Sequence, residues 1–447
     1  MDRRSLTRLL TALMLAFGLA AEGASAQSDS FSQRSLWLPQ IGSLSDALMR
    51  RAKAFERTPN DAEEGFWIGL GKIVFRAPTV LGLEARRIGM TCETCHGGGD
   101  TSRGFFIAGL SNKPRTVDLT STAFHRPAGD GRFNPIRIPS LRGVAATPPY
   151  GHRGTIPTLH AFTRHVVVDE FGGKPPAPKV MRALIAYLRA LKPAPNRLLG
   201  RSGQLTRAAS DQARRGAALF RRTWPGARGR SCASCHRPAG AFTDGRAHDV
   251  GTGGKINTPS LLGSALGGPF MHDGRFDRLD QAAGHYVAFA GRILTPRRRG
   301  DLVAYLHAVG AADGAYGKIT LASDLARVSS AVAVLAQALT RKEAALAGLV
   351  VVTVRRDIGR IHDRFPGREH AEVRRRMVRW SRLLQSVERA AERKAFTRAK
   401  SALAKAGTAG RKARKALSRA AATSLYDPVR LRAFLATLKP VRGRTTR

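Results

Sequence analysis

The stretch Ser231–His236 reads S-C-A-S-C-H, and a second copy of the pattern, T-C-E-T-C-H, occupies Thr91–His96. In each copy two cysteines enclose two residues and a histidine follows directly. This spacing is typical of c-type haem attachment, because both thiols can bond the vinyl groups of one porphyrin while the adjacent imidazole ligates the iron. The motifs use all four cysteines of the chain, and they predict two covalently bound haem c groups, held by Cys92, Cys95, His96, Cys232, Cys235 and His236.

Other uses of a Cys-x-x-Cys pair are half of a zinc site, a redox dithiol or a disulfide. Zinc sites normally close over a short ligand spacing, whereas Cys95 and Cys232 are far apart in the sequence. None of these uses explains a histidine directly after both pairs. Haem attachment is therefore the favoured interpretation.

The N-terminus predicts export. Arg3, Arg4 and Arg8 precede an apolar run at 9–21, which is too short for an ordinary membrane span, and Ala24-Ser25-Ala26 resembles a cleavage site. We expect a signal peptide cleaved after Ala26 and a periplasmic location; the alternative is an uncleaved anchor. No later segment has the ~18 unbroken apolar residues of a membrane span.

The chain has 447 residues and a formal net charge of +43. Its length leaves room for two or three domains. Such a charge attracts polyanions, which include nucleic acid, anionic lipid and acidic proteins. Export makes nucleic acid the least favoured partner, so no nucleic acid is expected.

The chain also contains an internal duplication. Ile138-Pro139-Ser140-Leu141 recurs as Thr258-Pro259-Ser260-Leu261, at an offset of 120 residues. The same offset aligns glycine, proline, histidine and aromatic positions: Gly143 with Gly263, Pro149 with Pro269, Tyr150 with Phe270, His152 with His272, Gly154 with Gly274 and His165 with His285. A run before each haem motif matches as well, 71–75 with 216–220. Ungapped agreement of this kind indicates two haem modules built from one duplicated unit.

We therefore predict a mostly α protein with two tandem cytochrome c-like haem modules plus a basic helical C-terminal extension. The expected parts are a signal peptide (1–26), a lead-in (27–64) with a short helix near 44–55, haem module 1 (65–195), a linker (196–204), haem module 2 (205–317) and a basic helical tail (318–447). The tail shows helical apolar spacing and then a stretch dense in Lys, Arg and Ala. It is either an appendage packed on the haem modules or an electrostatic anchor to an anionic membrane surface or acidic protein.

Three runs in module 2 resemble the bacterial diheme cytochrome c peroxidase family, including its relative that matures a tryptophan-derived quinone cofactor. They are F-T-D-G-R-A-H-D-V-G-T-G at 242–253, N-T-P-S-L-L at 257–262 and P-F-M-H-D-G-R at 269–275. The resemblance covers about 65–310 and excludes the tail. It implies that hydrogen peroxide is reduced at the haem on His96 and that the haem on His236 transfers electrons.

Function then depends on the sixth ligand of each iron. In module 2 the family's axial position falls near Tyr286, with Met271 as the rival after a Pro-aromatic turn and His285 close by. The repeat places Gly151 and Val166 at the Met271 and Tyr286 positions, which favours an open or histidine-capped first iron; the possible caps are His125 and His165. His152 and His272 are expected to bond haem propionates or backbone rather than iron.

Module 1 departs from the family. The usual W-D-G-R run is replaced by H-R-G-T at 152–155, and an expected glutamine by roughly Phe162. Asp169 or Glu170 could supply the acid that cleaves the O–O bond, or the two could be a surface pair at a helix end.

The leading prediction is a periplasmic diheme oxidoreductase that takes electrons from a small redox protein or a quinol-linked donor. The rivals are a non-enzymatic electron-transfer cytochrome that docks to an acidic partner or a membrane, and an oxidase of some other substrate.

Overall fold

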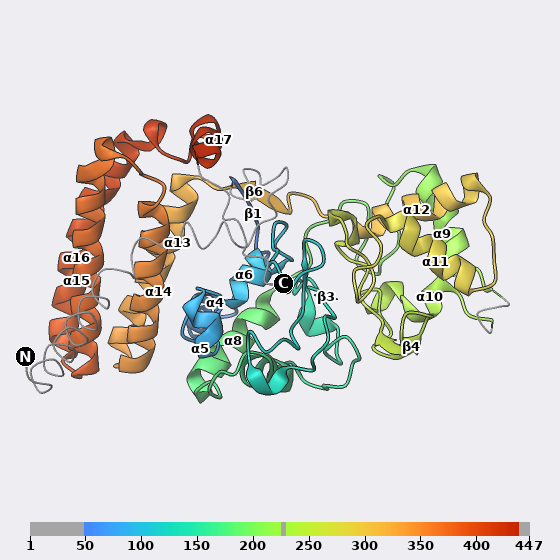
Figure 1. Cartoon of the computed structure of the whole chain (residues 1–447), viewed down its shortest axis with the longest axis horizontal. Coiled ribbons are helices and arrows are strands. Elements are labelled where there is room, and N and C mark those ends of the chain that lie inside the picture. The colour runs from blue at the N-terminus through green and yellow to red at the C-terminus, as the bar shows by residue number, and fades with distance from the viewer. Residues whose placement is uncertain (1–48, 225–228, 438–447) are drawn as a thin grey trace, which may run out of the picture.

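The computed structural model describes residues 49–224 and 229–437, so the predicted signal peptide lies outside the described part of the chain. Figure 1 shows three bodies in a row, with haem module 1 between the C-terminal helices and haem module 2. The chain is mostly helical, as predicted. The longer helices of module 1 are α4 (Ala62–Val74), α5 (Leu83–Arg87), α7 (Leu159–His165) and α8 (Pro178–Ala190); those of module 2 are α9 (Asp211–Arg221), α11 (Leu279–Phe289) and α12 (Pro296–Gly310).

In each module the helix before the haem motif crosses the last helix at a glycine. A Cβ atom on Gly71 of α4 would lie 1.9 Å from the carbonyl oxygen of Ala183 in α8. Gly216 of α9 approaches α12 in the same way, with 1.9 Å to the carbonyl oxygen of Asp301. Only a residue without a side chain permits backbones to approach this closely. The shared crossing confirms the duplication predicted from the sequence.

Strands are short and paired in twos. The antiparallel pairs are β1 (Arg50–Ala52) with β6 (Tyr316–Lys318), β2 (Thr116–Val117) with β3 (Ile136–Arg137), and β4 (Ala247–Asp249) with β5 (Lys255–Asn257). The prediction of a helix near 44–55 was wrong for the described residues, because 50–52 form β1. Its partner β6 lies more than 260 residues later, and this tertiary pairing overrides local preference.

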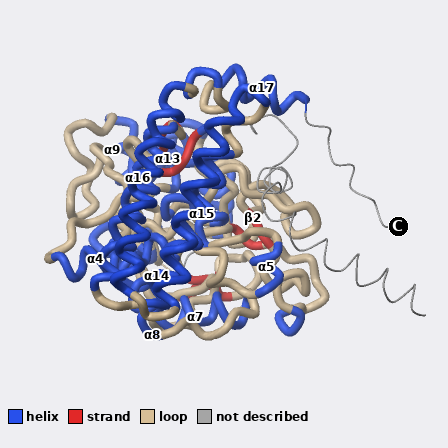
Figure 2. The backbone as a smooth tube through the Cα atoms, turned by 90° about the vertical axis from the view of Figure 1, so that its left-hand side faces the viewer, coloured by secondary structure: helices blue, strands red, loops and turns tan. Residues whose placement is uncertain are grey.

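The C-terminal segment folds into helices that pack on one another. They are α13 (Leu321–Thr340), α14 (Ala344–His362), α15 (Ala371–Glu392), α16 (Phe396–Arg419) and α17 (Pro428–Thr437). Contacts run from α13 to α14, α14 to α15 and α15 to α16, and α16 returns to α13. Figure 2 shows α13–α16 side by side across one end of the molecule. We call α13–α16 the C-terminal bundle.

The C-terminal bundle also packs on module 1. Both α13 and α14 contact α4, and one continuous apolar core joins buried residues of the two bodies, for example Leu70 and Ile73 with Leu335 and Val350. Module 2 has a separate core around Phe220 and Tyr305. The bundle and module 1 therefore form one packed unit, which agrees with the appendage interpretation of the tail. Among the described helices, none is long and apolar enough to cross a membrane.

Candidate functional site

The two Cys-x-x-Cys-His motifs have the same local structure. The cysteines lie at the ends of one-turn helices, α6 (Cys92–Cys95) and α10 (Cys232–Cys235). In both copies the backbone N–H of the N-cap residue donates to the hydroxyl of the residue three positions later. Thr91 donates to Thr94 Oγ1 and Ser231 donates to Ser234 Oγ, each at 3.0 Å. Positions three apart share one side of a helix, so both thiols of each pair point the same way. All four cysteines are free thiols.

The histidine after each pair lies close to the Pro-Ser-Leu loop of its own module. Burial lowers the pKa of His96 to about 4, against an opposing effect from the carbonyl of Pro139. Burial also lowers the pKa of His236, opposed by the carbonyls of Phe242 and Pro259. His236 Nδ1 donates to the Phe242 carbonyl at 3.0 Å. A bond at Nδ1 fixes the ring and leaves Nε2 available as a metal ligand.

These residues fit haem c. Each module offers two reduced thiols on one side of a helical turn and a half-buried, neutral imidazole directly after it. A bound haem would be held by Cys92, Cys95 and His96 in module 1, and by Cys232, Cys235 and His236 in module 2. The neutral ring is the protonation state that binds iron.

A second donor group shares Cys235. The ligand atoms of Cys235, Asp244 and His248 lie within 4.8 Å of one another, and His248 Nε2 lies 2.7 Å from Asp244 Oδ2. In the sequence, Asp244 and His248 stood out only as part of the stretch 242–253 that resembles the family. A thioether bond to haem would occupy the Cys235 sulfur, so we interpret Asp244 and His248 as a hydrogen-bonded pair beside the second haem.

Of the candidate sixth ligands in module 2, Tyr286 interacts with the haem-attachment thiols. Burial, together with the nearby Cys235 and Cys232, raises the pKa of Tyr286 to about 12. His285 is engaged elsewhere, because its Nε2 donates to the carbonyl of Val250 at 2.9 Å. Met271 sits in the turn bridged by Phe270 and Phe276, with a left-handed φ of 70°. Tyr286 and Met271 both stay predictions as ligands.

In module 1 the two acidic residues, Asp169 and Glu170, lie in different environments. The pair lies in a π-helical turn, Val166–Glu170, that continues α7. The Glu170 side chain is 21% exposed, and burial raises its pKa to about 6. The Glu170 carboxylate also contributes to the raised pKa of Cys95, so this carboxylate lies near the first haem-attachment site. Asp169 is 50% exposed. Glu170 is therefore the better candidate for a proton donor.

The histidines proposed as caps of the first iron have protein partners. His165 Nδ1 lies 2.8 Å from Asp169 Oδ2, and its Nε2 lies 3.7 Å from Glu170 Oε1. His125 Nδ1 donates to the carbonyl of Asp169 at 2.9 Å. His152 Nε2 donates to the Arg137 carbonyl at 3.0 Å, as expected for a histidine that bonds backbone. Phe162, at the position of the missing glutamine, stacks on Tyr150.

The two modules contact each other through equivalent parts of the repeat. The backbone N–H of Arg137 donates to the carbonyl of His272 at 2.7 Å, and that of Asn257 donates to the carbonyl of His152 at 2.8 Å. These four residues are related by the offset of 120, so the two bonds are exchanged reciprocally. The duplicated loops thus orient the haem modules toward each other.

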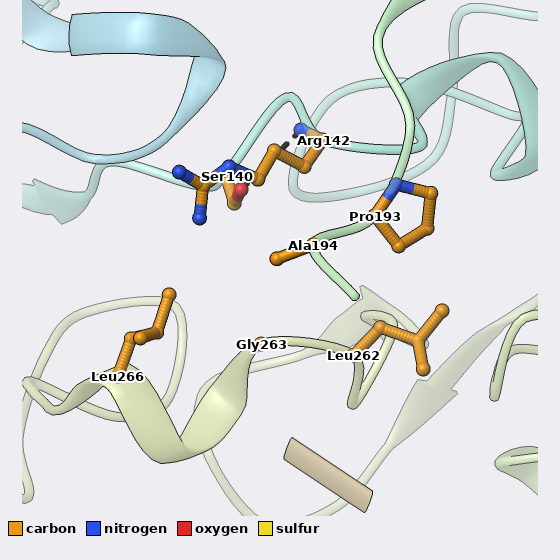
Figure 3. Close-up of a pocket in the computed structure, with 7 residues that line it drawn as sticks. All are labelled: Ser140, Arg142, Pro193, Ala194, Leu262, Gly263 and Leu266. Atoms are coloured by element: carbon orange, nitrogen blue, oxygen red, sulfur yellow. Dashed lines mark hydrogen bonds between the residues drawn. The ribbon is translucent and has the colours of Figure 1, made fainter. Parts of the chain in front are cut away.

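A small pocket lies where the two modules meet (Figure 3). It is lined by Ser140, Arg142, Pro193, Ala194, Leu262, Gly263 and Leu266. Arg142, the charged residue of the pocket, forms an ion pair with Asp100, and its Nη1 lies 3.2 Å from Asp100 Oδ2. No haem ligand or candidate catalytic residue lines it, so it belongs to the contact between the modules.

An ion-pair cluster that the sequence did not predict lies behind the first haem motif. Glu93, between the two cysteines of α6, lies 2.7 Å from Arg327 of α13 and 3.5 Å from Arg360 of α14. Asp357 pairs with the buried Arg76 at 3.3 Å. Burial alone would raise the pKa of Glu93, but Arg327, Arg360 and Arg51 hold it well below 4.5. Ion pairs from Arg327 and Arg360 to Glu93 therefore connect the C-terminal bundle to α6, the helix of the first haem motif.

Comparisons with known proteins agree with the geometry. Residues 210–341 match the family model for di-haem cytochrome c peroxidase. The methylamine utilization protein MauG of Methylorubrum extorquens is 27% identical over 297 residues, which is 55% of this chain and 78% of the relative. The cytochrome c peroxidase Ccp of Escherichia coli is 31% identical over 110 residues, 22% of each chain.

Solved structures with some likeness include a hydrazine synthase of Kuenenia stuttgartiensis and a MauG-like protein associated with microbial copper homeostasis. The first has a TM-score of 0.41 at 22% identity and covers 57% of this chain and 90% of that chain. The second has a TM-score of 0.37 at 18% identity and covers 57% and 92%. The sequence matches confirm the predicted resemblance: residues 210–341 of this chain are similar to the di-haem cytochrome c peroxidase family.

Proposed function

We propose that the protein is a periplasmic diheme c-type oxidoreductase that reduces hydrogen peroxide at the first haem, with electrons entering through the second. The observation that carries the proposal is the Glu170 carboxyl, which lies near the Cys95 thiol and has a pKa raised to about 6. Carboxyls with such pKa values are suited to proton transfer near neutral pH. The family match at 210–341 supports the diheme redox class.

Haem iron supplies the redox chemistry when it is bound. Reduction of one peroxide to two waters takes two electrons and two protons. Glu170 Oε, when protonated, is the group of this chain that would deliver a proton to the departing oxygen, and His165 Nε2, 3.7 Å from Glu170 Oε1, would return protons to it. On the other module, Tyr286, which lies near both thiols, would limit the access of peroxide to the second haem.

An electron-transfer cytochrome is the second candidate. It is favoured by His165, which lies next to Glu170 and would close the first iron if its ring turned toward the haem. The two functions differ at the first haem site, which would admit peroxide in the enzyme and would exclude it in the carrier.

The deciding experiment uses the holoprotein. A mass two haems above the processed chain is expected, together with a high-spin signal in electron paramagnetic resonance and peroxide-dependent oxidation of a reduced donor. Two low-spin haems without turnover would assign the carrier function instead. A mass equal to the bare chain, from a host able to mature c-type cytochromes, would reject both functions.

Replacement of Glu170 by glutamine is expected to lower kcat for peroxide by roughly 100- to 10,000-fold, the usual contribution of a positioned acid. Asp169→Asn, at the exposed neighbour, is the matched control and should change kcat little. Because the Glu170 pKa is about 6, its protonated form dominates below that pH and is lost above it. Native turnover limited by this proton should therefore fall as pH rises through about 6, and a native profile identical to that of E170Q would contradict the assignment.

A further inference from the structure

The outer helices of the C-terminal bundle carry a dense positive charge that the haem chemistry does not use. Helix α16 contains eight Lys and Arg residues and no Asp or Glu. Seven of these cations are exposed: Arg398, Lys400, Lys405, Arg411, Lys412, Lys415 and Arg419. Within the described part of the chain, none of the seven forms an ion pair with a carboxylate. We call these seven residues the basic face.

Helix α15 and the turn that follows it carry further exposed cations. Exposed cations there are Arg375, Arg379, Arg382, Arg389, Arg393 and Lys394. The other side of α16 is apolar and buried, with Ala399, Ala406, Ala413 and Leu417 against the rest of the bundle. Packing thus fixes the orientation of α16 and turns its cations outward. Figure 2 looks at this end of the molecule and shows α15 and α16 side by side.

The basic face lacks the features of a specific protein interface. Protein interfaces are organised around buried aromatic or apolar anchors, which carry most of the binding energy. The large exposed apolar side chains of the described residues are Leu83, Ile88, Phe133, Phe289, Ile293 and Val429, and none lies on α15 or α16. A surface of cations without anchors fits a diffuse, extended anion rather than an acidic protein groove.

Its dimensions fit a bilayer surface. The cations of α16 run from Arg398 to Arg419, so their row is about 32 Å long at 1.5 Å per residue. Each Lys or Arg close to an anionic leaflet contributes about 1 kcal/mol, and the sum needs no apolar insertion.

We propose that the basic face of α16, with the neighbouring cations of α15, docks the protein on an anionic phospholipid surface. The bundle lies at the end of the molecule opposite module 2 (Figure 1), so docking would leave the second haem site facing away from the lipid. The inference does not depend on peroxide reduction. It applies equally to an enzyme and to an electron carrier.

The test compares two holoprotein variants of equal net charge. In one, Lys400, Lys405, Lys412 and Lys415 of the basic face become Gln. In the control, four exposed cations of module 2 become Gln: Arg292, Arg297, Arg298 and Arg299. None of the eight residues forms an ion pair within the described residues, and glutamine keeps helix propensity. Circular dichroism and haem absorption should be unchanged in both.

Binding is measured by co-sedimentation with vesicles of phosphatidylglycerol and phosphatidylcholine, and with vesicles of phosphatidylcholine alone, over a range of salt. We expect the native protein to bind only the anionic vesicles and to be released by salt. The α16 variant should bind roughly 1,000-fold more weakly, because four charges of about 1 kcal/mol each are removed. The control should stay within about threefold of the native protein.

Three outcomes would overturn the proposal. Equal losses in both variants would mean that overall charge, not this face, attracts the lipid. Native binding that is the same for both kinds of vesicle would exclude anionic headgroups as the ligand. Binding of soluble polyglutamate that is lost in the α16 variant, with vesicle binding retained, would assign the face to an acidic protein.

Discussion

Replacement of Gly71 by alanine is expected to destabilise module 1 and the C-terminal bundle together, by about 3 kcal/mol. The new Cβ would lie 1.9 Å from the carbonyl oxygen of Ala183 and 2.7 Å from Cβ of Tyr187, so α4 and α8 would have to separate. Alanine gains at most about 1 kcal/mol of helix propensity, which the clash exceeds. Urea unfolding followed by circular dichroism and haem absorption measures the loss.

The matched change in module 2 is Gly216→Ala, where the Cβ would meet the carbonyl oxygen of Asp301 at the same distance. We expect a similar loss confined to module 2, since that module has its own core. Gly359→Ala in α14 is the control, because no atom lies within 4 Å of its Cβ position. That change should be neutral or slightly stabilising. Equal effects of all three substitutions would contradict the helix crossing described for the two modules.

Replacement of Arg327 by alanine is expected to cost about 3 kcal/mol, the low end for removal of one partner from a buried pair. The side chains of Arg327 and Glu93 are only 16% and 18% exposed, so Glu93 would keep its charge with Arg360, 3.5 Å away, as its remaining ion-pair partner. The loss should appear as easier unfolding of module 1, and the first haem should be affected before the second, because Glu93 lies between Cys92 and Cys95.

Two controls separate this charge effect from lost packing. The double variant Glu93→Gln with Arg327→Met removes both charges and should lose less than R327A, about 1 kcal/mol, because no buried charge stays unpaired. In the native protein the pKa of Glu93 is held below 4.5, so its ion pair stabilises the fold above that pH and is lost as pH falls through the depressed pKa. R327A should raise this pKa and shift acid unfolding to higher pH. A double variant as unstable as R327A would point to packing instead.

Much of the haem site could be predicted because its chemistry is local. The spacing of Cys92, Cys95 and His96 is set within five residues, and the structure builds it from one helical turn. The duplication was likewise predictable, because repeated Gly, Pro and His positions have the same structural role in both copies. The strand at 50–52 could not be predicted, since its pairing partner lies at the other end of the haem region.

The roles of the two carboxylates in module 1 also required the structure. Asp169 and Glu170 are adjacent, and composition gives no means to choose between them. The π-helical turn exposes Asp169 and buries Glu170, and burial is what raises the pKa of Glu170 to about 6. Desolvation depends on what surrounds a side chain, not on its neighbours in the sequence.

The sequence by itself determined the two Cys-x-x-Cys-His motifs, which predict two haem c groups, and the two copies of one helical unit, because thioether spacing and repeat positions are properties of short segments. Only the tertiary structure decided that the C-terminal bundle shares a core with module 1 and that Arg327 and Arg360 hold Glu93 behind the first haem motif. These contacts join residues more than 230 positions apart, and they exist because the packing of α13 and α14 on α4 brings their guanidinium groups to α6.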